Sequence, residues 1–286
     1  MLQMNLPMQV DLKDKVAVVT GGGGVLCSEM AKALAASGAK VVVMSRRVEP
    51  LETVVNAIKE DGGEAMAVSC DVTSYESLKT ANETITAAYG PCDILVNGAG
   101  GNHPKGTAGI ERLTPDLLQN SELTSFFDFD PEGIKFVFNL NLIGTVLATQ
   151  VFSKSMAERQ SGTIINISSM SAELPLTKVM SYSAAKSAVN SFTQWLAVHL
   201  SGVGVRVNAL SPGFFLTEQN HALLKNPDGS DTARGGLIVN NTPMRRYGEP
   251  EELLGTLLWL ASDKTSGFVT GAIIPVDGGF SAFSGV

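Results

Sequence analysis

The chain has 286 residues, 44% of them hydrophobic and 17% charged, and its formal net charge is −7. This acidic balance, without a run of Lys or Arg, argues against a nucleic-acid-binding surface, because phosphates select clustered basic side chains. We find no apolar run as long as a membrane helix, and the opening MLQMNLPMQVDLKDK lacks the apolar stretch of a signal peptide. Three scattered cysteines predict neither a disulfide framework nor a metal site. We therefore expect a cytoplasmic protein that acts on small molecules.

Apolar, β-branched runs alternate with helical patterns along the chain. Strands are predicted at 15–20, 40–45, 65–69, 93–97, 162–168, 203–210 and 272–276. Helices are predicted near 27–37, 48–61, 74–89, 132–158, 182–201 and 249–262. The strands are almost continuously apolar, which is typical of parallel strands buried on both faces. The alternation predicts one α/β domain over residues 1–286, a Rossmann-like, doubly wound parallel sheet of about seven strands with helices on both faces.

Two long segments interrupt this alternation, at 101–131 and 214–248. Each follows the carboxyl end of a predicted strand, where open α/β sheets bind their ligands. Loops of this length in a compact domain are usually functional. We expect them to be the walls of a substrate site.

A glycine-rich turn, Thr20-Gly21-Gly22-Gly23-Gly24, follows the first strand and leads into a helix. Glycines here let backbone amides approach a pyrophosphate at the helix N-terminus, although a merely flexible turn would have the same composition. Asp71-Val72 and Asn97-Gly98-Ala99-Gly100 follow the third and fourth strands at the same sheet edge. The residues expected to bind a dinucleotide in these turns are Gly21, Gly23, Gly24, Val25, Leu26, Asp71, Val72, Asn97, Ala99 and Gly100.

Ser169, Tyr182 and Lys186 form the most specific pattern. Tyr182 and Lys186 are spaced i, i+4 at the start of a helix, so they share a face, and Ser169 follows the fifth strand. A tyrosine acid/base needs its pKa of about 10 lowered toward neutrality, and a neighbouring ammonium favours the phenolate. The serine hydroxyl is suited to hold a substrate oxygen. A chance Y-x-x-x-K on a surface helix is the alternative interpretation.

Together with these residues, further motifs make the chain resemble the short-chain dehydrogenase/reductase family in its standard-length branch. The matches to its ordered motifs are Thr20-Gly21, Asn97 with Ala99-Gly100, Ser169, Tyr182 with Lys186, Pro212-Gly213, Thr217, Arg246-x-Gly248-x-Pro250-Glu251, Thr270-Gly271 and Asp277-Gly278-Gly279. The likeness runs from about residue 11 to 280. The third-strand Asp and these motifs imply an NAD(P)-dependent oxidoreductase.

The resemblance also implies residue roles. Tyr182 is the acid/base, Lys186 lowers its pKa and holds the nicotinamide ribose, and Ser169 positions the substrate oxygen. Asn141 matches the family's helix asparagine, which supports a proton-relay water. Further cofactor contacts are implied at Tyr182, Lys186, Pro212, Gly213, Phe215 and Thr217. A homotetramer built from the helices at 132–158 and 182–201 and the C-terminal segment is implied as well. A member that binds dinucleotide without catalysis is the alternative from another class.

The glycine fingerprint departs from the family at two positions. Aligned without gaps, Val25 and Cys27 stand where the second and third glycines are expected. We expect the extra glycines to let the turn adjust around Val25 and the small Cys27 to permit helix–strand packing.

The cofactor's ribose is expected at the end of the second strand. A carboxylate there suits NAD and an arginine suits the 2′-phosphate of NADP. This strand ends in Ser45-Arg46, so NADP is favoured, with NAD or dual use left open.

For the substrate, GGGGVLCSEMAKALA, NGAGGNHPK and SPGFFLTEQN are similar to a subgroup of D-mannonate oxidoreductases, or fructuronate reductases. This resemblance implies a polyhydroxylated sugar acid, which needs a cation and several donors. The candidate contacts are His103, Lys178 and Arg234, beside Asn102, Asn220 and His221. A gluconate 5-dehydrogenase or another polyol or carbonyl reductase is the alternative.

Overall fold

The computed structural model describes residues 10–285, apart from the side chains of residues 218 and 219. Its centre is a sheet of seven parallel strands in the order β3-β2-β1-β4-β5-β6-β7. The strands are β1 Val16–Thr20, β2 Lys40–Ser45, β3 Glu64–Ser69, β4 Ile94–Asn97, β5 Gly162–Ile167, β6 Val205–Pro212 and β7 Ile273–Val276. All seven predicted strands are present, and the predicted doubly wound sheet is confirmed.

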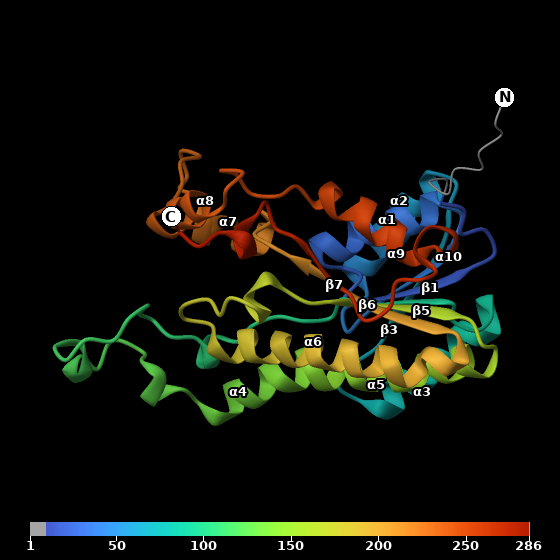
Figure 1. Ribbon diagram of the computed structural model, residues 1–286, viewed down its shortest axis with the longest axis horizontal. Coiled ribbons are helices and arrows are strands. Elements are labelled where there is room, and N and C mark those ends of the chain that lie inside the picture. Colours follow the sequence, from blue (N-terminus) through green and yellow to red (C-terminus); the bar gives the residue numbers. More distant parts are fainter. Residues whose placement is uncertain (1–9, 286) are drawn as a thin grey trace.

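Helices cover both faces of this sheet (Figure 1). One layer holds α1 (Val25–Ala36), α2 (Glu49–Glu60), α9 (Leu254–Ala261) and the short α10 (Asp263–Ser266). The other holds α3 (Tyr75–Tyr89), α4 (Pro131–Phe138), α5 (Gly144–Glu158) and α6 (Met180–Leu200). Short 3₁₀ turns occur at Pro104–Gly106, Leu117–Gln119, Phe126–Asp128, Met170–Ala172, Ser201–Val203, Pro250–Leu253 and Phe280–Ala282.

The alternation of side chains along a strand explains the two layers. In β1, Ala17 and Val19 join the core beneath α1, α2 and α9, whereas Val16 and Val18 join the core beneath α3, α5 and α6. Successive side chains point to opposite faces, so a strand buried on both sides must be apolar throughout.

The chain order creates one crevice in the sheet. From β1 it winds outward through β2 and β3, then returns to place β4 on the other side of β1. Loops therefore leave β1 and β4 toward opposite faces, and the carboxyl ends of these two strands form the topological switch point where such sheets bind ligands.

A segment predicted as one helix, 132–158, is divided by a turn of π-helix. The wider turn, Asn139–Ile143, separates α4 from α5. The continuous stretch Pro131–Glu158 is the one described helix with the length and apolarity to cross a membrane. Ala148, Phe152 and Met156 on this helix are fully buried against the sheet, as expected of a core helix.

Both long segments project from the same end of the sheet (Figure 1). The prediction of a loop over 214–248 is wrong in part, because it contains α7 (Glu218–Leu224) and α8 (Ala233–Asn241). These helices have a small core of their own, centred on Leu224, Ile238 and Tyr247. The segment closes at its base, where Phe215 pairs with Gly248. α7 and α8 are short, so only a few residues of each face a core, and the hydrophobic periodicity of the sequence does not reveal them.

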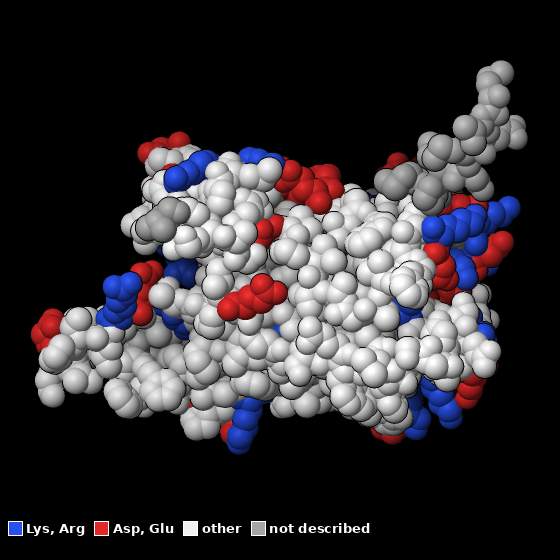
Figure 2. All heavy atoms as spheres, viewed as in Figure 1, with Lys and Arg blue, Asp and Glu red and all other residues white. Residues whose placement is uncertain are grey.

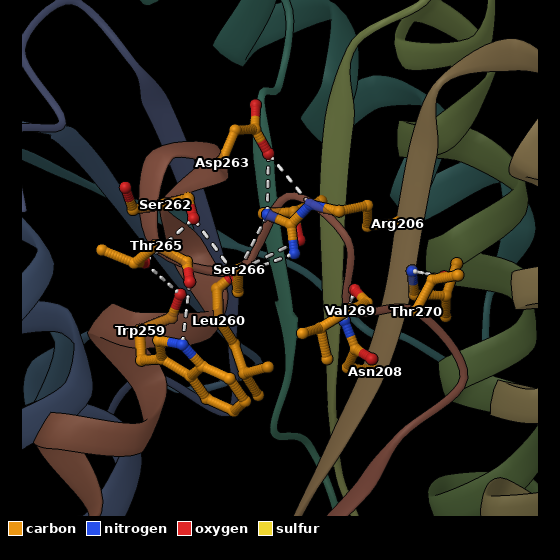
Figure 3. Close-up of polar contacts among 12 residues, drawn as sticks. Arg206, Asn208, Trp259, Leu260, Ser262, Asp263, Thr265, Ser266, Val269 and Thr270 are labelled. Carbon is orange, nitrogen blue, oxygen red and sulfur yellow. Dashed lines mark hydrogen bonds and ion pairs between the residues drawn. The ribbon is translucent and has the colours of Figure 1, made fainter. Parts of the chain in front are cut away.

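The turn after α9 is fixed to β6 through a buried arginine (Figure 3). The Arg206 guanidinium donates two hydrogen bonds to Asp263 Oδ1, at 2.9 and 2.7 Å, one to Ser266 Oγ and one to the Leu260 carbonyl. This contact connects α9 and α10 to the strand that leads into the second long segment.

Candidate active site

Ser169, Tyr182 and Lys186 are brought together at the carboxyl edge of the sheet. Ser169 lies two residues beyond the end of β5, and the other two lie in the first two turns of α6. The Lys186 ammonium donates a hydrogen bond to the Ile167 carbonyl at 2.7 Å and lies 5.6 Å from the centre of the Tyr182 ring. The Ser169 hydroxyl interacts with the Tyr182 phenol. The predicted grouping of these three residues is therefore seen in the fold.

Lys186 is buried, with 4% of its surface exposed. Burial lowers its pKa to about 8, partly offset by the nearby Cys27 thiol. An ammonium has three donors, and Ile167 takes one; the side chains that the structure describes supply no partner for the other two. Two N–H groups on a buried ammonium fit a pair of ligand hydroxyls, as a ribose presents.

The expectation for the Tyr182 pKa differs from what the folded chain gives. Burial raises the pKa of Tyr182, and the interaction with Ser169 only partly opposes this. The ammonium of Lys186 faces the ring rather than forming a hydrogen bond with the phenol oxygen. In the protein alone, Tyr182 is thus a neutral phenol, the form that donates a proton.

Asn141 lies in the π-helical turn and is fully buried. Its amide donates to the Gly101 carbonyl at 2.7 Å and to the Val137 carbonyl at 2.8 Å, while its Oδ1 accepts the Gly101 N–H at 3.1 Å. The side chain thus clamps the turn after β4. The backbone carbonyl of Asn141 accepts the Thr145 hydroxyl at 2.8 Å. A relay water on Asn141 stays a prediction.

Gly100 makes this arrangement possible. A Cβ at Gly100 would stand 2.7 Å from Asn141 Oδ1 and 3.2 Å from Lys186 Nζ. Any larger residue would therefore displace two of the four catalytic candidates. Gly21 has a similar constraint, because its φ is +69° and a Cβ there would strike Ala99 at 2.9 Å.

The glycine turn ends in a helix N-terminus suited to an anion. Gly24 caps α1 without a side-chain hydrogen bond, and among the described residues no acidic side chain lies in the first turn. Backbone amides and the positive end of the helix dipole remain for a ligand such as a pyrophosphate. Gly23, Gly24, Val25 and Leu26 all lie in this turn or at the start of α1.

The replacement of a fingerprint glycine by Cys27 is accommodated across the turn. Its sulfur packs against Gly98, where any Cβ would overlap it. Because Gly98 has no side chain, the Cys27 side chain on α1 fits against it, and α1 still packs closely on the turn after β4. Burial raises the pKa of the Cys27 thiol to about 11, with Lys186 opposing the shift.

Thr20, which the sequence analysis named only as part of the Thr20-Gly21 motif, has a structural role of its own at the site. It is buried, and its hydroxyl accepts the backbone N–H groups of Gly98 and Ala99, each at 3.1 Å. It holds the turns after β1 and β4 together at the switch point. Its place in the Thr20-Gly21 pair was the available signal.

At the predicted adenosine end, Arg46 is exposed and lies near Asp71. Partial burial would raise the pKa of Asp71, but hydrogen bonds from Thr73 and the charge of Arg46 outweigh it and lower the pKa. The Ser45 hydroxyl donates to the Arg47 carbonyl at 2.7 Å. Val72 is buried and packs on Gly144 at the start of α5.

Two cofactor candidates have side chains engaged elsewhere. The Asn97 amide donates to Thr149 and to Asn166 at 2.9 Å, inside the layer beneath α5 and α6. Phe215 is buried, with its ring against Gly248. The Asn97 side chain therefore fixes the end of β4, and the Phe215 side chain fixes the base of the segment 214–248.

The other three candidates on β6 and beyond, Pro212, Gly213 and Thr217, lie at the ends of structural elements. The Gly213 N–H donates to Val276 at 2.9 Å, directly after Pro212 at the end of β6. Thr217 caps α7 in a reciprocal arrangement with Asn220, so the Asn220 side chain stabilises the start of this helix.

The substrate candidates lie around the two long segments. Lys178 has φ +74°, and its carbonyl accepts the Ala108 N–H at 2.8 Å, which joins the 101–131 segment to the turn before α6. His103 caps a 3₁₀ turn through Nδ1, and its ring lies 4.9 Å from that of Phe136. The Arg234 guanidinium, on α8, lies 3.6 Å from the Glu111 carboxylate, and this ion pair joins the segment 214–248 to the segment 101–131.

The remaining two candidates are on the surface. Asn102 donates to Thr107 at 2.8 Å, and His221 is an exposed residue of α7. Within the described part of the chain, no three His, Cys, Asp or Glu side chains are grouped to hold a metal ion.

This fold and this site define a dinucleotide-dependent oxidoreductase, and comparisons with known proteins agree. A family model described as short chain dehydrogenase matches residues 15–228. The uncharacterized oxidoreductase UxuB of Bacillus subtilis (strain 168) is 52% identical over 98% of this chain and 100% of its own length. The chain belongs to the short-chain dehydrogenase family.

Two solved structures are also similar. One, from Haemophilus influenza, is provisionally named a D-mannonate oxidoreductase and contains bound NAD; it is 49% identical, with a TM-score of 0.94, over 99% of this chain and 100% of that one. A gluconate 5-dehydrogenase from Burkholderia cenocepacia J2315, in complex with NADP and tartrate, is 30% identical, with a TM-score of 0.80, over 97% and 99% of the two chains. The protein is thus an NAD(P)-dependent oxidoreductase that acts on CH–OH groups.

Proposed function

We propose that this enzyme interconverts the ketone of a keto-sugar acid and the secondary alcohol of its hydroxy acid, with D-fructuronate and D-mannonate as the pair. The observation that carries the chemistry is the grouping of Ser169, Tyr182 and Lys186 at the switch-point edge. The substrate rests on the similarity to the Haemophilus protein and on the basic residues Lys178, just before α6, and Arg234, on α8.

When bound, the nicotinamide supplies or accepts the hydride. In reduction, Tyr182 donates its proton to the carbonyl oxygen, and its raised pKa keeps that proton on the phenol until the oxygen gains charge. Ser169 holds the same oxygen, and the free donors of Lys186 bind the ribose beside it. Asn141 keeps the turn after β4 in register with Lys186. The proton relay through its backbone carbonyl belongs to this proposal.

Lys178 is our candidate for the substrate carboxylate. Its backbone is held in the left-handed region and fixed to Ala108, four residues before Tyr182. Among the side chains that the structure describes, none pairs with its ammonium. A non-glycine residue held in the left-handed region so close in the chain to a catalytic residue is typical of a functional site. His103 and Arg234 are the second candidates, because each already has a structural partner.

NADP is the favoured cofactor because of Arg46. Among the described residues no hydrogen bond or ion pair engages its guanidinium, although its charge acts on nearby Asp71, so its donors are available to a 2′-phosphate. NAD use is the competing outcome, since the similar Haemophilus structure contains NAD.

A homotetramer is also part of the proposal. Figure 2 shows few charged side chains over α6 and β7 in the middle of this face. On α6, Trp195 is 61% exposed and Val198 is 77% exposed, which suits an interface. Light scattering on the purified protein measures its mass in solution and so tests the tetramer. The cytoplasmic location stays a prediction.

The first experiment measures NADPH and NADH oxidation with D-fructuronate, 5-keto-D-gluconate and a simple ketone. We expect turnover with D-fructuronate and a lower KM for NADPH. A preference for 5-keto-D-gluconate moves the enzyme to the gluconate branch, in line with the Burkholderia relative. Tyr182→Phe should abolish turnover and leave the Kd of NADPH nearly unchanged. Cofactor binding without turnover of any carbonyl would instead support a dinucleotide-binding regulator.

Lys178→Met tests the carboxylate contact. We expect the KM for the keto-acid to rise roughly 10- to 100-fold, as when a charged hydrogen bond is removed. Turnover of an uncharged ketone is the internal control and should not change. Lys154→Met, on α5, is the matched surface control. An equal loss for charged and uncharged substrates would contradict the role of Lys178.

A further inference from the structure

Ser171 is a buried serine in direct contact with the catalytic serine. It lies in the 3₁₀ turn Met170–Ala172, two residues after Ser169, and is 0% exposed. Its side chain contacts other residues of the protein and has no surface open to a ligand. Its function must act through its neighbours.

Both donors of Ser171 point at one atom. Its hydroxyl donates to Ser169 Oγ at 3.0 Å, and its backbone N–H donates to the same oxygen at 3.2 Å. A serine hydroxyl has two acceptor lone pairs and a single proton. Ser171 therefore fills the acceptor capacity of Ser169 and leaves its proton to be donated elsewhere.

The direction left for that proton is the site. Ser169 is partly exposed at the sheet edge, and the Tyr182 phenol is its neighbour there, with the interaction favouring the phenolate. We propose that Ser171 is a positioning residue, which fixes the rotation of the Ser169 hydroxyl so that its single proton points into the site, at Tyr182 in the free enzyme and at the reacting oxygen once substrate is bound. A donor that is already aimed needs no reorganisation when negative charge develops on that oxygen.

This inference rests on the oxidoreductase activity but not on the identity of the substrate. The first test is Ser171→Ala, which removes the hydroxyl donor and keeps the turn's backbone N–H. We expect kcat to fall roughly 10- to 100-fold, with the KM for the cofactor unchanged. In a Ser169→Ala background, the same change should have no further effect, because nothing is left to orient.

Ser187 provides the matched control. Its hydroxyl donates to the Ala172 carbonyl at 2.6 Å and to the Ser183 carbonyl at 3.0 Å, so it fixes the same 3₁₀ turn to α6 without touching Ser169. Ser187→Ala should lower the melting temperature and leave kcat unchanged. An equal fall in kcat for both variants would mean that Ser171 only holds the turn, and would overturn the proposal.

A second readout needs no substrate. The ionisation of Tyr182 is followed by ultraviolet difference titration, with Tyr182→Phe as the blank and circular dichroism as the check of folding. In Ser171→Ala the titration midpoint should move upward, because Ser169 no longer donates reliably to the phenolate. Unchanged midpoint and kcat would overturn the role of Ser171, whereas absent wild-type turnover with a shifted midpoint would overturn only the proposed substrate.

Discussion

Replacing Gly100 by alanine tests how tightly the catalytic residues are packed. The new Cβ would stand 2.7 Å from Asn141 Oδ1 and 3.2 Å from Lys186 Nζ. Gly100 is not among the glycines with positive φ, so the backbone accepts alanine and the effect comes from contact alone. Ordinary carbon–oxygen contacts are at least about 3.3 Å, so Oδ1 must retreat by roughly half an ångström.

That retreat disturbs the hydrogen bonds between Asn141 and Gly101, at 3.1 and 2.7 Å, and moves the turn relative to Lys186. Overpacking a core lowers the free energy of unfolding by about 1–3 kcal/mol. Each kcal/mol lowers the melting temperature by about 2–4 °C in a chain somewhat smaller than this one. A misplacement of 1 Å costs about 100-fold in rate, so we expect kcat to fall about 10-fold.

The assays are thermal unfolding and NAD(P)H oxidation, with cofactor binding followed by fluorescence. Gly255→Ala, in α9, is the control, because no atom lies within 4 Å of the added Cβ. Gly255 lies in the first turn of α9, so alanine there should stabilise the protein by no more than about 0.5–1 kcal/mol, the gain expected in a helix interior. If Gly100→Ala melts and turns over like the wild type, the packing argument for the site is refuted.

Three further predictions concern the rest of the molecule. Asp263→Ala leaves the buried Arg206 guanidinium with two neutral acceptors, so the free energy of unfolding measured by chemical denaturation should fall by about 1–3 kcal/mol. A denaturation midpoint equal to that of the wild type would show that the ion pair does not contribute to stability. Burial lowers the pKa of Lys186 to about 8, so above that pH the unfolded chain binds more protons than the folded chain does. The free energy of unfolding of the wild type should therefore rise relative to that of Lys186→Met from pH 8 toward pH 10. A difference that does not change with pH would contradict the lowered pKa. All three thiols are buried, with raised pKa values, so a disulfide reagent should label none of them until the protein unfolds; rapid labelling of the native protein would show that the site opens.

Much of the site follows from residue types and spacing. The i, i+4 spacing of Tyr182 and Lys186 puts them on one helical face, and parallel strands place Ser169 at the same edge. These relations depend on helix and sheet geometry, which is the same in every protein. The partners of the Asn97 side chain could not be predicted, because its position in the sequence gives no sign of which face of β4 it occupies or of its contacts with Thr149 and Asn166.

The sequence by itself determined the sheet, its two helical layers and the family, because buried parallel strands and a glycine turn leave local patterns. Only the tertiary structure decided three other properties. It formed α7 and α8 in a segment without a clear period, it packed Cys27 against Gly98, and it raised the pKa of Tyr182. Each depends on contacts between residues far apart in the chain, and on the solvent that those contacts exclude.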